Sequence, residues 1–352
     1  MTAITIVGTG AHVPGDPISN EALARVMDTS DEWIIRRTGI EQRHFAEDGQ
    51  GASDLGVPAA KKAIAAAGLE PSDIDYIIFA TMTPDHFFPG CGPILGAKLG
   101  IPGVPALDIR QQCAAIPYAL QLANGLAASG AAKNILLVGA EAHAGFMPWS
   151  SWDVVRSQSD REVSKEEFER ATRHRGLAII FGDGASAMVL QKSDQTGAGF
   201  IDAQLHSDGN QCETLFTPGV GFRQVPYVTP EALAEEQHIP RMRGQSLFKT
   251  AVHQLTRVVR NLLDENDLTK DDVDWFIAHQ ANDRINEAVR RALKVPKEKV
   301  PSNIARYGNT SAATIGLLTD ELLREGTMNK GDLVCFFALG AGLNWGAALL
   351  RL

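Results

Sequence analysis

The chain has 352 residues, enough for two domains or a duplicated one, and its 44% hydrophobic and 21% charged residues are typical of a soluble globular protein. Its formal net charge of -9 excludes a general nucleic-acid binder, although a local basic patch is still possible. Four widely spaced cysteines without metal-ligand spacing favour a reducing compartment. Since we find neither a signal-peptide pattern nor a run of about 18 apolar residues, we expect a cytoplasmic protein without membrane association.

Strands and helices alternate along the first half of the chain, which is typical of an α/β fold whose sheets are covered by helices. The apolar pattern predicts these strands: Ala3–Val7 closed by Gly8 and Gly10, Ile74–Ala80, Val104–Ile109, Ile135–Val138, and a hairpin-like pair of Ala178–Phe181 and Ala185–Gln191. Helices are expected at Ser19–Met27, at Ala52–Ala67, at Gly92–Gly100 and after Cys113.

The second half repeats the first. We predict helices at Gly244–Asp267 and Asn282–Leu293 and strands at Leu333–Ala338 and Trp345–Leu350. The segment AGLEPSDIDYIIFA at Ala67–Ala80 matches NDLTKDDVDWFIAH at Asn266–His279 with an offset of 199 residues. We therefore expect an N-terminal half at residues 1–191 and a C-terminal half at residues 192–352.

Residues 147–175 interrupt this repeat. The segment contains the charged stretch SDREVSKEEFERATRHR, in which Ser164 and Glu167 are typical of a capping box that opens a helix. A solvated surface insertion and a lid or oligomer contact are both compatible with this pattern, and we favour the solvated insertion.

Cys113 lies where the strand after Gly103 meets a helix marked by apolar residues at helical spacing. The free amides and the positive dipole end of a helix N-terminus stabilise a thiolate, which would make the cysteine reactive. A buried structural cysteine fits the same pattern, so this stretch alone leaves both interpretations open.

Three further features could complete a site around a nucleophilic cysteine. His279 ends an apolar strand in FIAHQAN, Asn309 precedes a helix of small residues in GNTSAA, and LGAGLNWG offers backbone amides to an oxyanion. Each has a structural alternative: a hydrogen-bonded rim histidine, a helix N-cap and a tight turn. Their matching positions in a duplicated fold favour one shared site. The other three cysteines are interpreted as structural, and no metal site is expected.

Together, these motifs resemble the β-ketoacyl-acyl carrier protein synthase III family of condensing enzymes. The resemblance rests on DTSDEWIIRRTGI, the Cys113 junction, RGLAIIFGDGASA, HQAN, GNTSAA and LGAGLNWGAALLRL, and it covers nearly the whole chain. It implies a thiolase-like fold with two βαβαβαββ halves in αβαβα layers. It also implies decarboxylative condensation of an acyl-CoA primer with malonyl-acyl carrier protein, which initiates fatty acid synthesis, by a homodimer that needs no cofactor because acyl-CoA is a substrate.

The resemblance assigns roles to individual residues. Cys113 would be the acyl-accepting nucleophile, His279 and Asn309 would promote malonyl decarboxylation, and the amides of Cys113 and Ala341 would form the oxyanion hole. The remaining assignments are coenzyme A contacts at Thr29, Trp33, Arg37, Arg175 and Asn282, and carrier-protein docking at Lys249 and Arg284.

The sequence departs from the family pattern around the acyl pocket. The family's CAGF is CAAIP at Cys113–Pro117, a gating phenylalanine is kept at Phe88, a second one is replaced by Leu339, and a glycine is replaced by Ala341. We therefore expect an unusual primer that is longer than acetyl. A related acyl-CoA condensing or acyltransferase enzyme of secondary metabolism is the alternative. A non-catalytic thiolase-fold partner is disfavoured by the intact catalytic residues.

Overall fold

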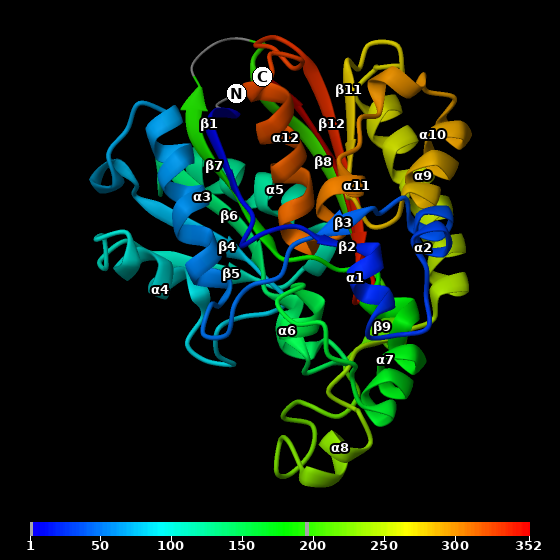
Figure 1. Cartoon of the computed structure of the whole chain (residues 1–352). Coiled ribbons are helices and arrows are strands. Elements are labelled where there is room, and N and C mark those ends of the chain that lie inside the picture. Colours follow the sequence, from blue (N-terminus) through cyan, green and yellow to red (C-terminus); the bar gives the residue numbers. More distant parts are fainter. Residues whose placement is uncertain (1–2, 194–196) are drawn as a thin grey trace.

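A computed structural model describes residues 3–193 and 197–352 and shows two main sheets with helices on both sides of each (Figure 1). In the described residues, one sheet has the strand order β1-β7-β6-β4-β5 and the other β11-β12-β13-β8. The first consists of β1 (Ala3–His12), β4 (Tyr76–Ala80), β5 (Ala106–Ile109), β6 (Asn134–Glu141) and β7 (Gly184–Ser193). The second consists of β8 (Gly199–Ser207), β11 (Trp275–Ala278), β12 (Leu333–Gly340) and β13 (Asn344–Arg351).

The two sheets share one pairing scheme. β4 is parallel to β6, which is antiparallel to β7, and β7 is antiparallel to β1. In the same way, β11 is parallel to β12, β12 is antiparallel to β13, and β13 is antiparallel to β8. β6 begins at Asn134 and β12 at Leu333, the offset of the sequence repeat. The mixed α/β architecture is therefore as expected, while the division of the chain after residue 191 stays a prediction.

The helices form three layers around these sheets. α5 (Ala115–Ala128) and α12 (Thr314–Arg324) lie between the sheets, and their apolar side chains share one core with residues of both. α3 (Ala52–Ala66) and α4 (Cys91–Lys98) cover the outer face of the first sheet. α9 (Gly244–Glu265) and α10 (Asp283–Leu293) cover the outer face of the second. This is the αβαβα layering expected from the sequence.

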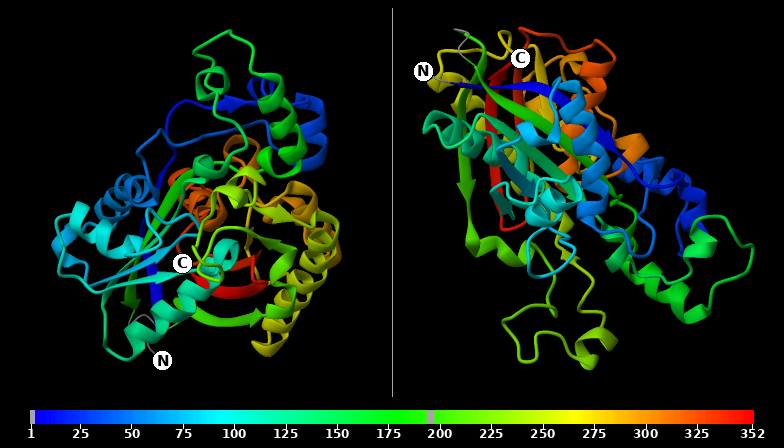
Figure 2. Two further views of the ribbon diagram at one scale, coloured as in Figure 1. Left: turned by 90° about the horizontal axis from the view of Figure 1, so that it is seen from below. Right: turned by 90° about the vertical axis from the view of Figure 1, so that its left-hand side faces the viewer.

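Shorter elements join these layers. They are β2 (Ile18–Ser19), β3 (Gln42–Arg43), β9 (Leu215–Phe216), β10 (Arg241–Met242), α1 (Asn20–Ala24), α2 (Asp31–Thr38), α6 (Trp152–Val155), α7 (Lys165–Ala178), α8 (Pro230–Ala234) and α11 (Ile304–Tyr307). The segment that holds α8 extends away from the body of the protein (Figure 2). In residues 3–193 and 197–352, we find no helix with the length and apolarity needed to cross a membrane.

Two strand predictions are wrong for tertiary reasons. β1 continues through Gly8 and Gly10, because a side chain at either position would clash with the backbone of α3, so these glycines allow close packing rather than end the strand. The segment Ala178–Phe181 is the end of α7 and the residues after it, and Phe181 pairs with Asn309 rather than with a hairpin partner. β8 was not predicted.

The insertion at residues 147–175 is buried in its apolar part and exposed along most of its charged part. Trp149 is 4% exposed and Val154 is fully buried, and both join the apolar cluster that contains Leu23 and Met27. Ser164 caps α7 by accepting a hydrogen bond from the backbone N–H of Glu167, as the capping pattern predicts. The solvated interpretation is thus wrong for the apolar part of this segment.

Candidate active site

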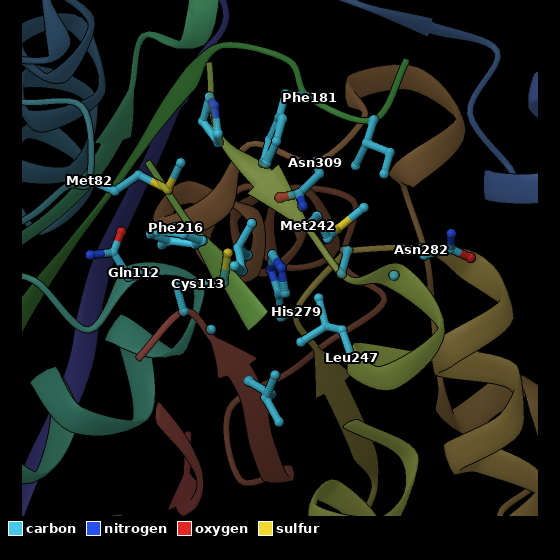
Figure 3. Close-up of a pocket in the computed structure, with 18 of the residues that line it drawn as sticks. Met82, Gln112, Cys113, Phe181, Phe216, Met242, Leu247, His279, Asn282 and Asn309 are labelled. Carbon is cyan, nitrogen blue, oxygen red and sulfur yellow. The ribbon is translucent and has the colours of Figure 1, made fainter. Parts of the chain in front are cut away.

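A cavity of about 1020 Å³ opens where β5, β11 and β12 end. Cys113, His279, Asn309 and Ala341 all line it, so the structure brings together the four residues that the sequence predicts for the reaction centre. Figure 3 shows Cys113, His279 and Asn309 facing the same space. Sites at the carboxyl ends of sheet strands are the rule in α/β proteins.

Cys113 lies in a sharp turn between β5 and α5. The turn is a short 3-10 helix, Gln112–Ala114, entered through Gln112 in the left-handed region at a φ of 53°. The related turn Ser311–Ala313 in the other half begins the same way, with Ser311 at a φ of 47°. The two turns meet at the site, where Sγ of Cys113 is 3.4 Å from Oγ of Ser311.

The Cys113 side chain is only 6% exposed, and this burial raises the pKa of the thiol to about 12. The hydrogen bond with Ser311 lowers the pKa, but by less than burial raises it. Burial therefore opposes the thiolate that a helix N-terminus favours. The cysteine is both buried and placed in the cavity.

His279 follows β11 and is 5% exposed. Its Nδ1 is 2.7 Å from Oγ1 of Thr314, and its carbonyl oxygen accepts a hydrogen bond from the side chain of Asn286. Burial lowers the pKa of the imidazole to about 3, so His279 is neutral at physiological pH.

Asn309 is held from three sides. Its backbone N–H donates to Ile180 at 2.9 Å, and its carbonyl oxygen accepts from the N–H of Gly182 at 3.1 Å. Its side-chain Oδ1 accepts from the N–H of Ser311 at 2.8 Å. These contacts leave the Nδ2 group as the part of the side chain that can donate into the cavity.

The turn after β12 presses against the nucleophile. A Cβ atom on Gly340 would lie 2.8 Å from the backbone nitrogen of Cys113, so only glycine allows this approach. Ala341 therefore follows directly beside the Cys113 amide, where the sequence predicts the oxyanion hole. Leu339 also lines the cavity.

Three of the five residues predicted to bind coenzyme A line the cavity, and a fourth, Arg175, contacts one of them. The guanidinium carbons of Arg37 and Arg175 lie 4.1 and 4.9 Å from the ring centroid of Trp33. Trp33, Arg37 and Asn282 line the cavity, and Asn282 also caps α10. Thr29 and Arg175 lie outside its lining, but Oγ1 of Thr29 is buried and has no hydrogen-bond partner among the described residues.

The other predicted residues lie in two different places. Lys249 and Arg284 are exposed side chains that line the cavity. Within the described part of the chain, neither forms an ion pair, although Arg284 lies 5.9 Å from the ring centroid of Phe248. Phe88 is 78% exposed and does not line the cavity of this single chain.

Two residues in or beside the cavity were not predicted from the sequence. Glu141 is fully buried and accepts hydrogen bonds from Thr81, Thr83 and the amide of Ala312, which ties the loop after β4 to the turn of the other half. As a single acid at a strand end, it gave no signal. Cys212, interpreted as structural, lines the cavity. In the described ranges, we find no group of three or more His, Cys, Asp or Glu residues able to hold a metal ion.

This duplicated fold and its buried cysteine, histidine and asparagine define a condensing enzyme of the thiolase fold. Two family models match the chain: 3-oxoacyl-[acyl-carrier-protein] synthase III at residues 107–160 and 163–209, and the C-terminal region of the same enzyme at residues 263–352. The chain belongs to the 3-oxoacyl-[acyl-carrier-protein] synthase III family.

Relatives of known name cover the full chain. The β-ketoacyl-[acyl-carrier-protein] synthase III of Rhizorhabdus wittichii is 37% identical over 351 residues, with 100% of each chain covered. That of Ehrlichia canis is 37% identical over 353 residues, again with 100% coverage of both.

Solved structures agree with these relatives. The 3-oxoacyl-[acyl-carrier-protein] synthase III of Aquifex aeolicus VF5 matches with a TM-score of 0.83 and 35% identity over 100% of both chains. The enzyme of Pseudomonas aeruginosa PAO1 gives a TM-score of 0.83 and 35% identity over 99% of this chain and 98% of its own. The relatives confirm the predicted acyltransferase of fatty acid initiation over the alternative in secondary metabolism.

Proposed function

We propose that the chain loads an acyl group from acyl-CoA onto Cys113 and then condenses it with malonyl-acyl carrier protein. The observation that carries this proposal is the convergence of Cys113, His279 and Asn309 on one cavity. These side chains come from both sheet systems and have a nucleophile, a neutral imidazole and a free amide donor as their functional groups.

In the first step, the Cys113 thiol loses its proton as Sγ bonds to the acyl carbon. The thioester oxygen takes up negative charge, which the amides of Cys113 and Ala341 stabilise as hydrogen-bond donors. The bond from the acyl carbon to the sulfur of coenzyme A then breaks, and coenzyme A leaves as a thiol with the released proton. The close contact of Gly340 with the Cys113 amide supports this pairing of donors.

In the second step, His279 and Asn309 donate hydrogen bonds to the thioester oxygen of the malonyl group. The carbon–carbon bond to the carboxylate breaks, and carbon dioxide leaves. The electron pair of the broken bond stays on the substrate and forms an enolate, which these two donors stabilise. The enolate carbon attacks the acyl carbon on Cys113, the bond from that carbon to Sγ breaks, and the leaving thiolate takes up a proton from solvent. The low pKa of His279 supports this role, because the imidazole stays neutral and its single N–H can donate to the thioester oxygen throughout the reaction. The reaction as proposed includes no metal or redox cofactor.

Coenzyme A would bind with its adenine between Trp33 and Arg175. Their present separation of 4.9 Å is too small, because an inserted ring needs about 3.5 Å on each side. Arg175 must therefore move away by about 2 Å and release Asp28, whose Oδ2 it contacts at 3.0 Å.

The malonyl group would arrive on an acidic carrier protein. Lys249 and Arg284 provide exposed positive charge at the same cavity on a chain whose net charge is -9. Such a local basic rim attracts an acidic partner through the field at the cavity mouth. This charge distribution supports docking of the carrier at this rim.

We further propose a cytoplasmic homodimer with a primer longer than acetyl. The edge of β5 is unpaired in the described sheet and Leu107 on it is 38% exposed, which supports association of two chains there. A gating role for Phe88 then requires that a second chain place it at a cavity. Leu339 in place of a phenylalanine supports the longer primer, and four unpaired cysteines fit a reducing compartment.

Intact-protein mass spectrometry tests the proposal. The chain is incubated with acyl-CoAs of increasing length, and malonyl-acyl carrier protein is then added. We expect one acyl adduct that is absent in Cys113→Ala and that malonyl-carrier protein releases as a β-ketoacyl product. Adduct formation on Cys113→Ala would refute the assignment of Cys113 as the acyl-accepting nucleophile. If malonyl-carrier protein does not release the acyl group from the loaded enzyme, the proposal that it is the second substrate would be refuted.

A further inference from the structure

One short segment of the chain, residues 311–314, holds both side chains that donate hydrogen bonds in the proposed decarboxylation step. Asn309 is fixed through its acceptor atom, Oδ1, by the N–H of Ser311 at 2.8 Å. His279 is fixed through Nδ1, which lies 2.7 Å from Oγ1 of Thr314. Ser311 begins the turn Ser311–Ala313, and Thr314 is the first residue of α12, so both anchors belong to one continuous segment.

The Thr314 hydroxyl has a single hydrogen and two acceptors within reach. Ser311 O lies 3.1 Å from Oγ1, and Nδ1 of His279 lies 2.7 Å away. Ser311 O already accepts the backbone N–H of Thr314, so it does not need the hydroxyl. Nδ1 of His279 has no second hydrogen-bond partner among the described residues. The Nδ1 contact is the shorter of the two, and Ser311 O already has a donor, so we infer that the hydroxyl donates to Nδ1 rather than to Ser311 O.

We propose that Thr314 is a positioning residue whose hydroxyl donates to Nδ1 of His279 and so places the imidazole proton on Nε2, facing the cavity. A neutral imidazole carries one N–H, so a hydrogen bond accepted at Nδ1 determines the tautomer. His279 and Asn309 are then arranged alike. In each, the acceptor atom (Nδ1 or Oδ1) binds a donor from the same segment, and the N–H donor (on Nε2 or Nδ2) is free to bind the substrate.

The opposite tautomer would not support the second step. It would turn the lone pair of Nε2 toward the thioester oxygen, where negative charge develops as carbon dioxide leaves. Only Asn309 would then donate to that oxygen. The inference rests on the proposed function, because it concerns the donor to the malonyl thioester, whereas Thr314 itself need not contact any reacting atom.

The site offers a matched pair of variants. Thr314 is 2% exposed and packed at the start of α12, so Thr314→Val keeps the shape of the side chain and removes the hydroxyl. Thr314→Ser keeps the hydroxyl and removes a methyl group. The two variants therefore separate the hydrogen bond from the packing.

The experiment measures the two half-reactions separately. Acyl transfer from acyl-CoA to Cys113 is followed by intact mass, and release of labelled carbon dioxide from malonyl-carrier protein reports decarboxylation. We expect Thr314→Val to slow decarboxylation by about 100-fold, as loss of one oxyanion donor does, with acyl transfer changed by less than about threefold. Thr314→Ser should recover most of the decarboxylation rate. In ¹⁵N spectra of histidine-labelled wild-type protein, the proton of His279 should be on Nε2.

Three results would overturn the inference. The first is a wild-type spectrum with the proton on Nδ1, which does not depend on how any variant folds. The second is an unchanged decarboxylation rate in Thr314→Val, and the third is an equal loss of both half-reactions in both variants. Failure of the wild-type protein to load Cys113 or to decarboxylate malonyl-carrier protein would instead refute the proposed function, and the spectrum would still report the tautomer.

Discussion

Replacing His279 with glutamine should remove a defined part of the acid sensitivity of the fold. Burial lowers the pKa of His279 from 6.5 to about 3, so the unfolded chain binds this proton at a pH where the folded chain does not. The contribution of the neutral imidazole to stability is therefore fully present above pH 6.5 and is lost as the pH falls toward 3. At about pH 5, the loss from this single group is about 2 kcal/mol relative to about pH 8.

Urea denaturation at these two pH values measures the effect as a double difference. His279→Gln loses some stability at both pH values through altered packing, but its deficit relative to wild type should be about 2 kcal/mol smaller at about pH 5. His253→Gln, an exposed change on α9, is the control and should show the same deficit at both. Dilute protein is needed because the isoelectric point is near 5.5. An equal deficit for His279→Gln at both pH values would refute the reasoning.

Three more substitutions test the geometry of the site. Gly340→Ala should slow acyl loading by at least about tenfold, because its Cβ would lie 2.8 Å from the amide nitrogen of Cys113 and would displace the oxyanion hole; loading at the wild-type rate would contradict this. Arg175→Ala should raise KM for acyl-CoA by about fivefold with kcat preserved, whereas the exposed Arg161→Ala should change neither. Leu339→Phe should shift primer preference toward shorter acyl groups, measured by competition between acyl-CoAs, since a larger ring fills part of the cavity; an unchanged chain-length profile would show that Leu339 does not limit the primer.

The sequence was sufficient to predict that the residues of the reaction centre lie close together, because the chain is duplicated. A repeated unit places equivalent loops at equivalent strand ends, so the turn at Gln112 and the turn at Ser311 have the same left-handed entry and meet at the site. His279 follows β11 as Thr81 follows β4, which brings it to the same edge. Local patterns and the repeat together were therefore sufficient to place these residues.

What the sequence could not supply depends on contacts between distant segments. Gly8 and Gly10 resemble strand ends until α3 packs over them, and Ala178–Phe181 resembles a strand until Phe181 pairs with Asn309. Thr314 was visible in the sequence, but its role depends on how close it lies to His279 in space. The same holds for the pKa of Cys113, because burial in the folded chain raises it whereas its position at a helix start favours a lower value.

Burial also determines how the nucleophile is activated. With a pKa of about 12, ionising Cys113 at neutral pH costs about 7 kcal/mol, and protonating His279 with a pKa of about 3 costs about 5 kcal/mol. Even at about 4 Å, the attraction between the resulting charges returns only about 4 kcal/mol at the effective dielectric of a protein. Burial of both groups therefore disfavours a resting thiolate–imidazolium pair. The thiol proton must leave as the bond to the acyl carbon forms, so the negative charge moves directly to the thioester oxygen, where the amides of Cys113 and Ala341 are already in place.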